Sequence, residues 1–290
     1  MKSVIKSCVV FKRRIMLKML AIIVSYPKMA SMLFGLEKIL QQEIMVLDAF
    51  NPAEMTIALG ILGIVAMHTL PGFIENNEKK SLMIKLQRDY SVYTNGVNQA
   101  ISENGSPDMW SKTDQPISLT DINDVLSGYF KVIKNCENLS GCFPDFKYKN
   151  LKGIYNETVL NSDDSYTKFK LIDGTSIAIN LWSNQCDLDW GDGYQLNNVC
   201  GTLVMDLNGE KRPNTYGIDF FGFAFTRYGL VPLGSQNQSA FPFSAFCSTT
   251  SNANFKYENG LSCTAWVLYN KNMDYLDCKG LNWGTKTTCG

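Results

Sequence analysis

The hydrophobic and polar positions of the middle part of the chain follow a helical period. Apolar residues recur there at steps of three or four, which places them on one helix face. They are Leu82, Leu86, Tyr90, Tyr93, Val97 and Ala100. We expect this helix to end near Asn104-Gly105, with Pro107 as a stop. Because an apolar stripe must be covered, it is predicted to pack on a sheet formed by the downstream chain.

The pattern changes beyond this helix. A second, shorter helix is predicted over residues 118–134, with Thr120 as its N-cap. Residues 166–172 and 175–181 flank Asp173-Gly174, which predicts a β-hairpin with a type I′ turn. Further strands are expected at 201–207, 220–226 and 264–269, and the polar stretch 235–254 is expected to be a loop. The pattern favours an antiparallel meander and an α+β fold.

An apolar run precedes the amphipathic helix. Residues 55–74 carry no formal charge and would extend over roughly 30 Å as a helix, the thickness of a bilayer core. We therefore expect the first half of one long helix to span a membrane, a buried core helix being the alternative. Residues 1–49 hold 8 Lys and Arg against 3 Asp and Glu. This excess predicts a single-pass protein with a cytoplasmic N-terminus and a periplasmic or extracellular head.

The cysteines favour an oxidising compartment for the downstream part. Cys8 stands alone, whereas an even set of eight follows residue 105: Cys136, Cys142, Cys186, Cys200, Cys247, Cys263, Cys278 and Cys289. Proximity in the sequence suggests pairing in that order, although eight cysteines allow 105 pairings.

Composition limits the chemistry of the head. The one histidine is His68, so histidine-dependent nucleophilic catalysis and imidazole zinc sites are disfavoured after residue 105. The formal net charge is zero, which gives no reason to expect nucleic acid as a partner. We expect no enzymatic activity.

The segment around the apolar run resembles a known family. Residues 50–66 read FNPAEMTIALGILGIVA, and Pro71 and the amphipathic helix follow. This resembles the N-terminal segment of type IV pilins and type II secretion pseudopilins. Ala49 stands where the family usually has Gly, and Asn51-Pro52 replaces the commoner Thr-Leu pair.

The resemblance implies a structural subunit of a filament. Residues 1–49 would be a leader, or an over-extended N-terminus, removed by a prepilin peptidase between Ala49 and Phe50. The new amine of Phe50 would be methylated, and Glu54 would pair with that amine of a neighbouring subunit. Pro71 would bend the helix 50–104, residues 105–290 would form the head, and the partners would be other pilin subunits and the inner membrane.

Two acidic clusters in the head raise the question of calcium. Asp206 and Asn208 precede Gly209 with the spacing that opens a calcium loop, and Asp219 could add an oxygen ligand. A plain turn uses the same residues, and we favour the turn. For the second cluster, Asp187, Asp189 and Asp192, a turn is also favoured.

Two other functions remain open for the head. Exposed Trp182, Trp190, Trp266 or Trp283 would suit a non-polymerising, membrane-anchored adhesin or lectin, although core packing is the favoured role of each. Paired acids could serve a surface hydrolase, but no pair is placed around a cleft by the sequence.

Overall fold

The computed structural model describes residues 52–113, 115–249 and 258–289, and the chain divides into two compact units, Met1–Pro71 and Gly72–Gly290. Helix α3 crosses the boundary between them. The elements are α3 (Pro52–Asn104), η2 (Pro107–Met109), α4 (Leu119–Leu126), β1 (Val132–Glu137), η3 (Leu160–Ser162), β2 (Tyr166–Leu171), β3 (Ser176–Leu181), β4 (Val199–Asp206), β5 (Phe220–Thr226), β6 (Gly229–Pro232), α5 (Phe243–Phe246), α6 (Cys263–Asn270) and η4 (Asp274–Leu276).

The second unit is built on one six-stranded antiparallel sheet. Its strands follow in the order β1 to β6, each paired with the next in the chain, so the predicted meander is confirmed. The predicted hairpin is the β2–β3 pair, in which Thr167 lies opposite Ile179. Of the two turn residues only Gly174 takes a positive φ angle, 85°, so the turn is not type I′.

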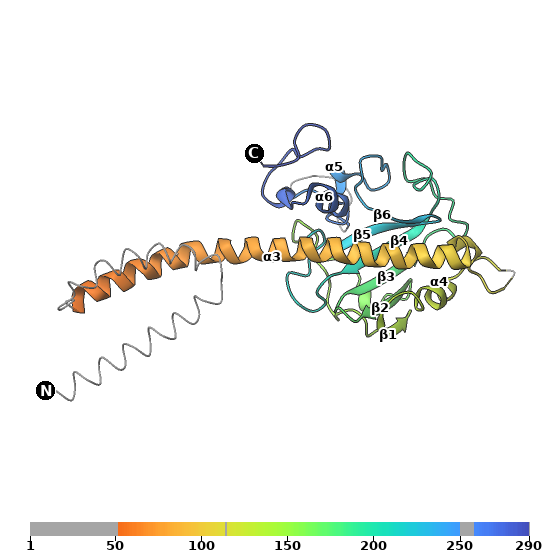
Figure 1. Cartoon of the computed structure of the whole chain (residues 1–290), viewed down its shortest axis with the longest axis horizontal. Coiled ribbons are helices and arrows are strands. Elements are labelled where there is room, and N and C mark those ends of the chain that lie inside the picture. The colour runs from red at the N-terminus through yellow and green to blue at the C-terminus, as the bar shows by residue number, and fades with distance from the viewer. Residues whose placement is uncertain (1–51, 114, 250–257, 290) are drawn as a thin grey trace, which may run out of the picture. The chain divides into compact units, whose positions relative to one another are not determined.

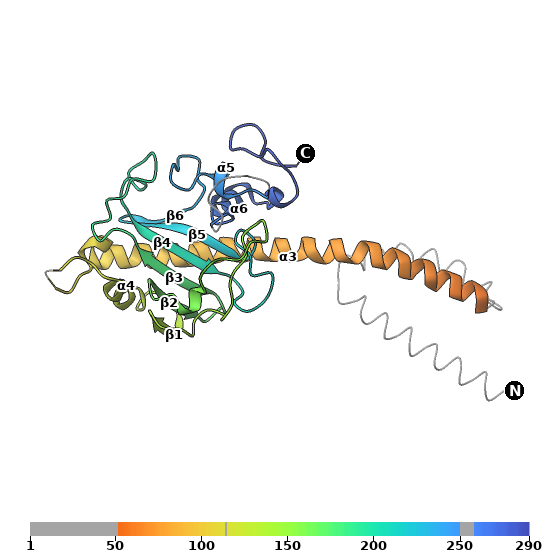
Figure 2. The same ribbon diagram turned by 180° about the vertical axis from the view of Figure 1, so that it is seen from behind.

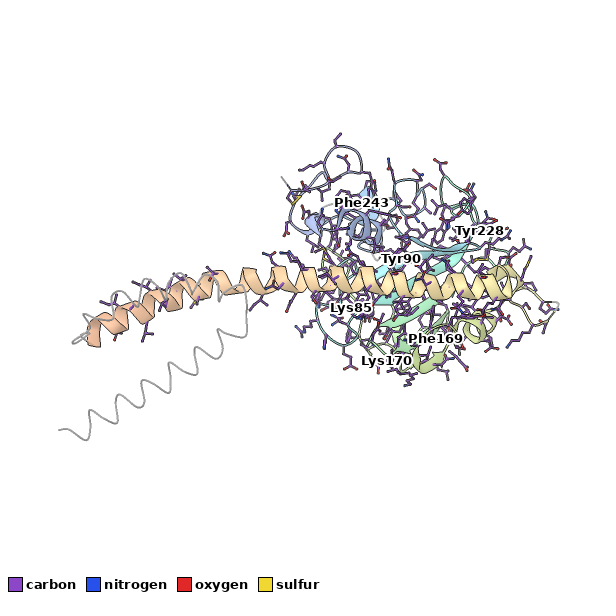
Figure 3. The ribbon with its side chains drawn as sticks, in the orientation of Figure 1. Lys85, Tyr90, Phe169, Lys170, Tyr228 and Phe243 are labelled. Carbon is purple, nitrogen blue, oxygen red and sulfur yellow. A yellow bond between two sulfur atoms is a disulfide. The ribbon has the colours of Figure 1, made fainter. Side chains whose placement is uncertain are left out.

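Helix α3 covers one face of this sheet over its part in the second unit. Figure 1 shows α3 in front of strands β3 to β5, and Figure 2 shows the same strands in front of the helix. The predicted stripe faces the sheet: Leu86, Tyr93, Val97 and Ala100 are buried in the core that also holds the alternate β5 side chains Phe221, Phe223 and Phe225. The ring of Tyr90 stacks on Phe223 with centroids 5.5 Å apart. Figure 3 shows Tyr90 and Lys85 on this part of α3.

The opposite face of the sheet is also covered. Side chains that alternate with the first set, such as Ala178, Val204 and Ala224, belong to a second core with Tyr148, Trp190 and other side chains from the connecting segments. Strands β4 and β5 are therefore buried along their whole length. This explains why they read as nearly continuous apolar runs and not as alternating ones.

Four disulfides cross-link the second unit, which confirms the predicted disulfide bonding. They join Cys136 to Cys142, Cys186 to Cys200, Cys247 to Cys263, and Cys278 to Cys289. The bonded cysteines are between 6 and 16 residues apart in the sequence, and the pairs are those that proximity suggested.

The expectation of a membrane-spanning first half of the long helix is wrong. Within the described part of the chain, the structure contains no helix with the length and apolar character that crossing a membrane requires. The apolar run is instead the beginning of the 53-residue helix α3, which continues into a polar sequence after Ile74. The fold is therefore a long helix and a six-stranded antiparallel sheet, without a membrane-spanning helix in the described residues. The predicted single-pass membrane localisation is wrong for the same reason.

Two element predictions are also corrected. The predicted helix 118–134 is only the eight-residue α4, which begins after Ser118 and not at Thr120. The Ser118 hydroxyl accepts from Asp121 N–H, and the Asp121 carboxylate accepts from Ser118 N–H, so these two residues form a capping box. Residues 264–269 form helix α6 and not a strand. A short apolar run is compatible with either element, and here burial of Trp266 and Val267 against the core favours the helix.

Candidate assembly surface and polar sites

The first part of α3 exposes an unusual number of large apolar side chains. Seven of them keep between 53% and 73% of their surface exposed: Ile57, Leu59, Ile61, Leu62, Ile64, Val65 and Met67. At about 3.6 residues per turn, their positions are distributed around the whole helix circumference. We call residues 57–67 the apolar segment. A helix that is apolar all round is stable when other apolar groups surround it.

Two glycines lie inside the apolar segment. A Cβ atom added at Gly60 or Gly63 would meet nothing within 4 Å. Glycine in an exposed helix costs about 1 kcal/mol relative to alanine, and no contact within the described chain requires it. Small residues of this kind allow a neighbouring helix backbone to approach closely.

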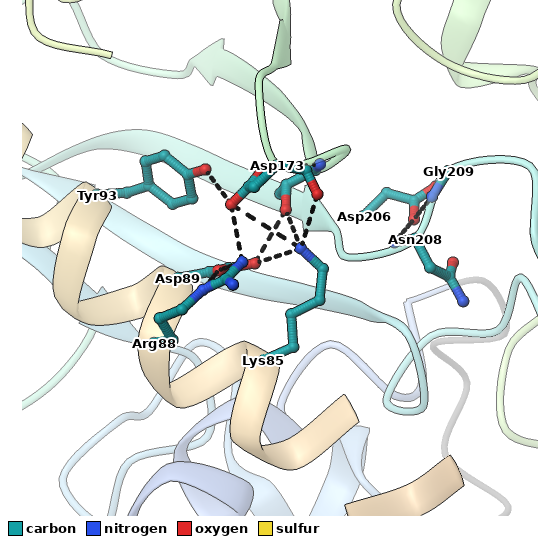
Figure 4. Close-up of polar contacts among 9 residues, drawn as sticks. Lys85, Arg88, Asp89, Tyr93, Asp173, Asp206, Asn208 and Gly209 are labelled. Atoms are coloured by element: carbon teal, nitrogen blue, oxygen red, sulfur yellow. Dashed lines mark hydrogen bonds and ion pairs between the residues drawn. The ribbon is translucent and has the colours of Figure 1, made fainter. Parts of the chain in front are cut away.

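A polar cluster fixes α3 to the β2–β3 turn (Figure 4). The Asp89 side chain is fully buried. Its carboxylate forms ion pairs with Lys85 Nζ at 3.0 Å and with Arg88 Nη2 at 2.8 Å. The Thr175 hydroxyl donates a hydrogen bond to the same carboxylate at 2.9 Å. Arg88 Nη2 also lies 3.1 Å from the Asp173 carboxylate. The cluster therefore connects the helix to the turn after β2 with charge-assisted hydrogen bonds.

The same cluster changes the ionisation of its members. Burial raises the pKa of Asp173, but the hydrogen bond from Thr175 N–H and the Lys85 charge outweigh it, so that this pKa lies below its ordinary value. The Tyr93 hydroxyl donates to Asp173 at 2.9 Å, and burial together with the nearby carboxylate raises the pKa of Tyr93. This arrangement keeps Asp173 charged and Tyr93 neutral over the physiological range.

The proposed calcium loop has the hydrogen bonding of a turn. Asp206 Oδ1 accepts from the N–H groups of Asn208 (3.0 Å) and Gly209 (2.8 Å), and its Oδ2 accepts from the Tyr148 hydroxyl. The Asp219 carboxylate accepts from Thr215 N–H and Asn214 N–H, both at 2.7 Å. Every carboxylate oxygen of the two acids thus already accepts a hydrogen bond from the chain.

The environment of Asp206 is nonetheless unusual. Burial raises the pKa of Asp206 to about 7 against the lowering effect of its hydrogen bonds, and the neighbouring Asp219 charge adds to the rise.

Over the described ranges, no group of three or more His, Cys, Asp and Glu side chains could hold a metal ion. Calcium at Asp206, Asn208 and Asp219 stays a prediction, and the turn accounts for their contacts.

The second acidic cluster also serves local turns. Asp187 accepts from the Ser183 hydroxyl at 2.5 Å, and Asp189 accepts from Gly191 N–H at 3.0 Å. Asp192 instead lines a surface hollow. Asp187 and Asp189 therefore stabilise local turns, whereas Asp192 lines the hollow.

The four tryptophans considered for sugar binding differ in exposure. Trp190 and Trp266 are buried, as the packing role predicts, whereas Trp182 is 52% exposed. Trp283 is half-buried and lines the same hollow as Asp192. The core-packing prediction is thus confirmed for the two buried rings.

The residues predicted for processing and assembly are placed only in part. Ala49 and Phe50 lie outside the described residues, and so does the side chain of Glu54. Pro71 lies within α3, at the boundary of the two units, and its predicted bend stays a prediction.

Sequence reasoning missed the polar cluster at α3. Lys85 and Arg88 do not belong to the apolar stripe, and in the sequence only the Lys85–Asp89 spacing of four residues indicates a pair on that helix. The partner Asp173 lies far along the chain and was assigned only to a turn.

Comparison with protein-family models, curated proteins and solved structures gave no match for the chain.

Proposed function

We propose that this chain is a structural subunit that assembles with copies of itself into a filament through the apolar segment of α3. The observation that carries the proposal is the exposure of large apolar side chains on all sides of one helix. A single partner would cover only one side. Several neighbouring helices are needed to cover all of them, which is the arrangement of a filament core and not of a simple dimer.

The glycines of the segment support close packing in such a core. Gly60 and Gly63 leave open space around the helix backbone, and a neighbouring helix could enter it. The resemblance to type IV pilins and pseudopilins adds the processing steps to the proposal. A prepilin peptidase would cut before Phe50, and Glu54 would pair with the new amine of a neighbouring copy and set the register between subunits.

The disulfide-bonded second unit would form the folded head of each filament subunit. Its contact with α3 involves the apolar stripe and the buried Asp89 cluster. Residues 57–67 belong to the first unit, and the exposure of their large apolar side chains leaves the apolar segment available for assembly.

A matched pair of variants tests the proposal. Ile61 is 58% exposed in the apolar segment, and Ile133 is 60% exposed on strand β1. Both Ile61→Asp and Ile133→Asp should fold, because each places a charge at an exposed position. Burying an unpaired carboxylate between helices is strongly unfavourable, so Ile61→Asp should lose assembly while Ile133→Asp should retain it.

Sedimentation and electron microscopy of the full-length protein, isolated from cells that produce it, measure the outcome. Equal assembly of Ile61→Asp and the unsubstituted chain would contradict the proposal, and so would failure of the unsubstituted chain to assemble. Glu54→Ala tests the register step separately, since it leaves the apolar segment intact.

A further inference from the structure

A surface hollow in the second unit has the size of a small-molecule site. Its volume is about 430 Å³, within the range of roughly 300 to 1,000 Å³ that is usual for ligand pockets. The side chains that give it chemical character are Tyr194, Tyr269, Trp283, Asp192, Gln195 and Asn237. Neither the filament proposal nor the disulfide framework assigns it a role.

Four separate segments of the chain build the hollow, and disulfides hold three of them, while residues 231–237 form the fourth. Cys186–Cys200 closes the loop that carries Asp192 to Leu196, and Cys278–Cys289 closes the loop that carries Trp283. Cys247–Cys263 ties down the start of α6, on which Tyr269 lies.

Hydrogen bonds join these segments to one another. Asp192 N–H donates to Asn237 O at 3.0 Å, and Trp283 Nε1 donates to Gly234 O at 3.1 Å. The Trp283 ring also packs on the buried Trp266, with centroids 5.1 Å apart. A site fixed in this way loses little conformational freedom when a ligand binds.

The lining combines aromatic rings with neutral hydrogen-bonding groups. Tyr194 and Tyr269 are 69% and 61% exposed, so their rings are accessible to a ligand. Gln195, Gln236 and Asn237 each offer an amide that both donates and accepts, and Ser235 adds a hydroxyl. Among the described residues that line the hollow there is no Lys or Arg, and Asp192 contributes a negative charge. Phosphate and carboxylate ligands therefore find no counter-charge.

We propose that this hollow binds a neutral saccharide. A sugar ring has an apolar C–H face that packs on an aromatic ring and a rim of hydroxyls that both donate and accept hydrogen bonds. A quaternary ammonium would use the aromatic rings and Asp192, but its methyl groups would leave the amides and the hydroxyl without partners. The lining thus matches a polyhydroxylated neutral ligand best.

Binding to an array of neutral, acidic and sulfated oligosaccharides tests the proposal, with choline and inorganic phosphate as further probes in calorimetry. We expect at least one neutral oligosaccharide to bind. Tyr269→Ala should weaken that binding about tenfold, because the lost ring contact is worth roughly 1.4 kcal/mol. Asn237→Ala removes an exposed amide and should weaken it as well. Tyr155→Ala is the matched control, since Tyr155 is 55% exposed and lies outside the hollow.

Three results would overturn the proposal: no neutral oligosaccharide binds, choline or phosphate binds in a Tyr269-dependent way, or the bound sugar is unaffected by both hollow variants. Ile61→Asp should bind the sugar as the unsubstituted chain does. A failure of assembly is thereby kept distinct from a failure of the saccharide site.

Discussion

The carboxyl group of Asp206 should make the stability of this protein depend on pH. Asp206 lies at the end of β4 and is 1% exposed, with Tyr148, Asn208 and Gly209 donating to it. Burial raises its pKa to about 7, and the Asp219 charge contributes in the same direction. In the unfolded chain the pKa returns to its ordinary value of 3.8.

The sign of the effect follows from proton binding. Between pH 3.8 and about pH 7 the folded state keeps a proton on Asp206 that the unfolded state has released. The free energy of unfolding therefore falls as pH rises through this window. A difference of about 3 pKa units corresponds to roughly 4 kcal/mol at most. The pKa of Asp219 is raised by burial and acts in the same direction, whereas Asp173, with a lowered pKa, titrates below the window.

Replacing Asp206 by asparagine removes the titration and keeps the shape of the side chain. The asparagine oxygen can still accept from Asn208 and Gly209, and its amide can donate to the Tyr148 oxygen. Denaturant unfolding of the oxidised protein at about pH 5 and about pH 8 should show a loss of stability at the higher pH in the unsubstituted chain and a much smaller loss in Asp206→Asn. Asp189→Asn, an exposed turn carboxylate, is the control. A flat profile in the unsubstituted chain, or an unchanged slope in Asp206→Asn, would refute the reasoning.

Three further predictions follow from the structure and the proposed processing. Asp89→Ala should lower the free energy of unfolding by about 3 kcal/mol in denaturant titrations, because it removes the charged partner of the partly buried Lys85 and the acceptor of the buried Thr175 hydroxyl. Arg88→Ala should cost less than about 1 kcal/mol, since the Arg88 side chain is 57% exposed, and equal costs would contradict this. Replacing both Cys247 and Cys263 by alanine should cost about 3 kcal/mol through the opened 16-residue loop, and an unchanged unfolding midpoint would argue against a stabilising bond. Mass spectrometry of the protein isolated from its cells should find a methylated Phe50 at the N-terminus and a gain of about eight mass units on reduction, whereas an intact leader would oppose prepilin processing.

The sequence allowed prediction of those features that depend on local pattern. The stripe from Leu82 to Ala100, the β2–β3 hairpin and the disulfide pairs all involve residues that are close in the chain, so period, turn residues and proximity were sufficient. The continuous apolar run of β5 was also recognisable, because a strand covered on both faces has no polar side.

Features that depend on tertiary packing were not predictable in the same way. Residues 264–269 read as a strand, but their burial around Trp266 makes them helix α6. The hollow joins Tyr194 with Tyr269 and Trp283 from distant segments, and no spacing in the sequence indicates that they meet. The membrane-spanning helix was predicted from a run of apolar residues and the basic residues before it, and the structure contains no such helix in its described part.

The central claim is that the apolar segment of α3 is buried between copies of the chain in an assembly. Site-specific photo-crosslinking of full-length assembled protein tests it most directly, with Ile61 or, as the control, Ile133 replaced by benzoylphenylalanine. Position 61 should give multimers whose cross-linked peptides come from residues 57–67 of other copies, while position 133 should give few. Absence of cross-links between copies at position 61, or equal yields at both positions, would contradict the account.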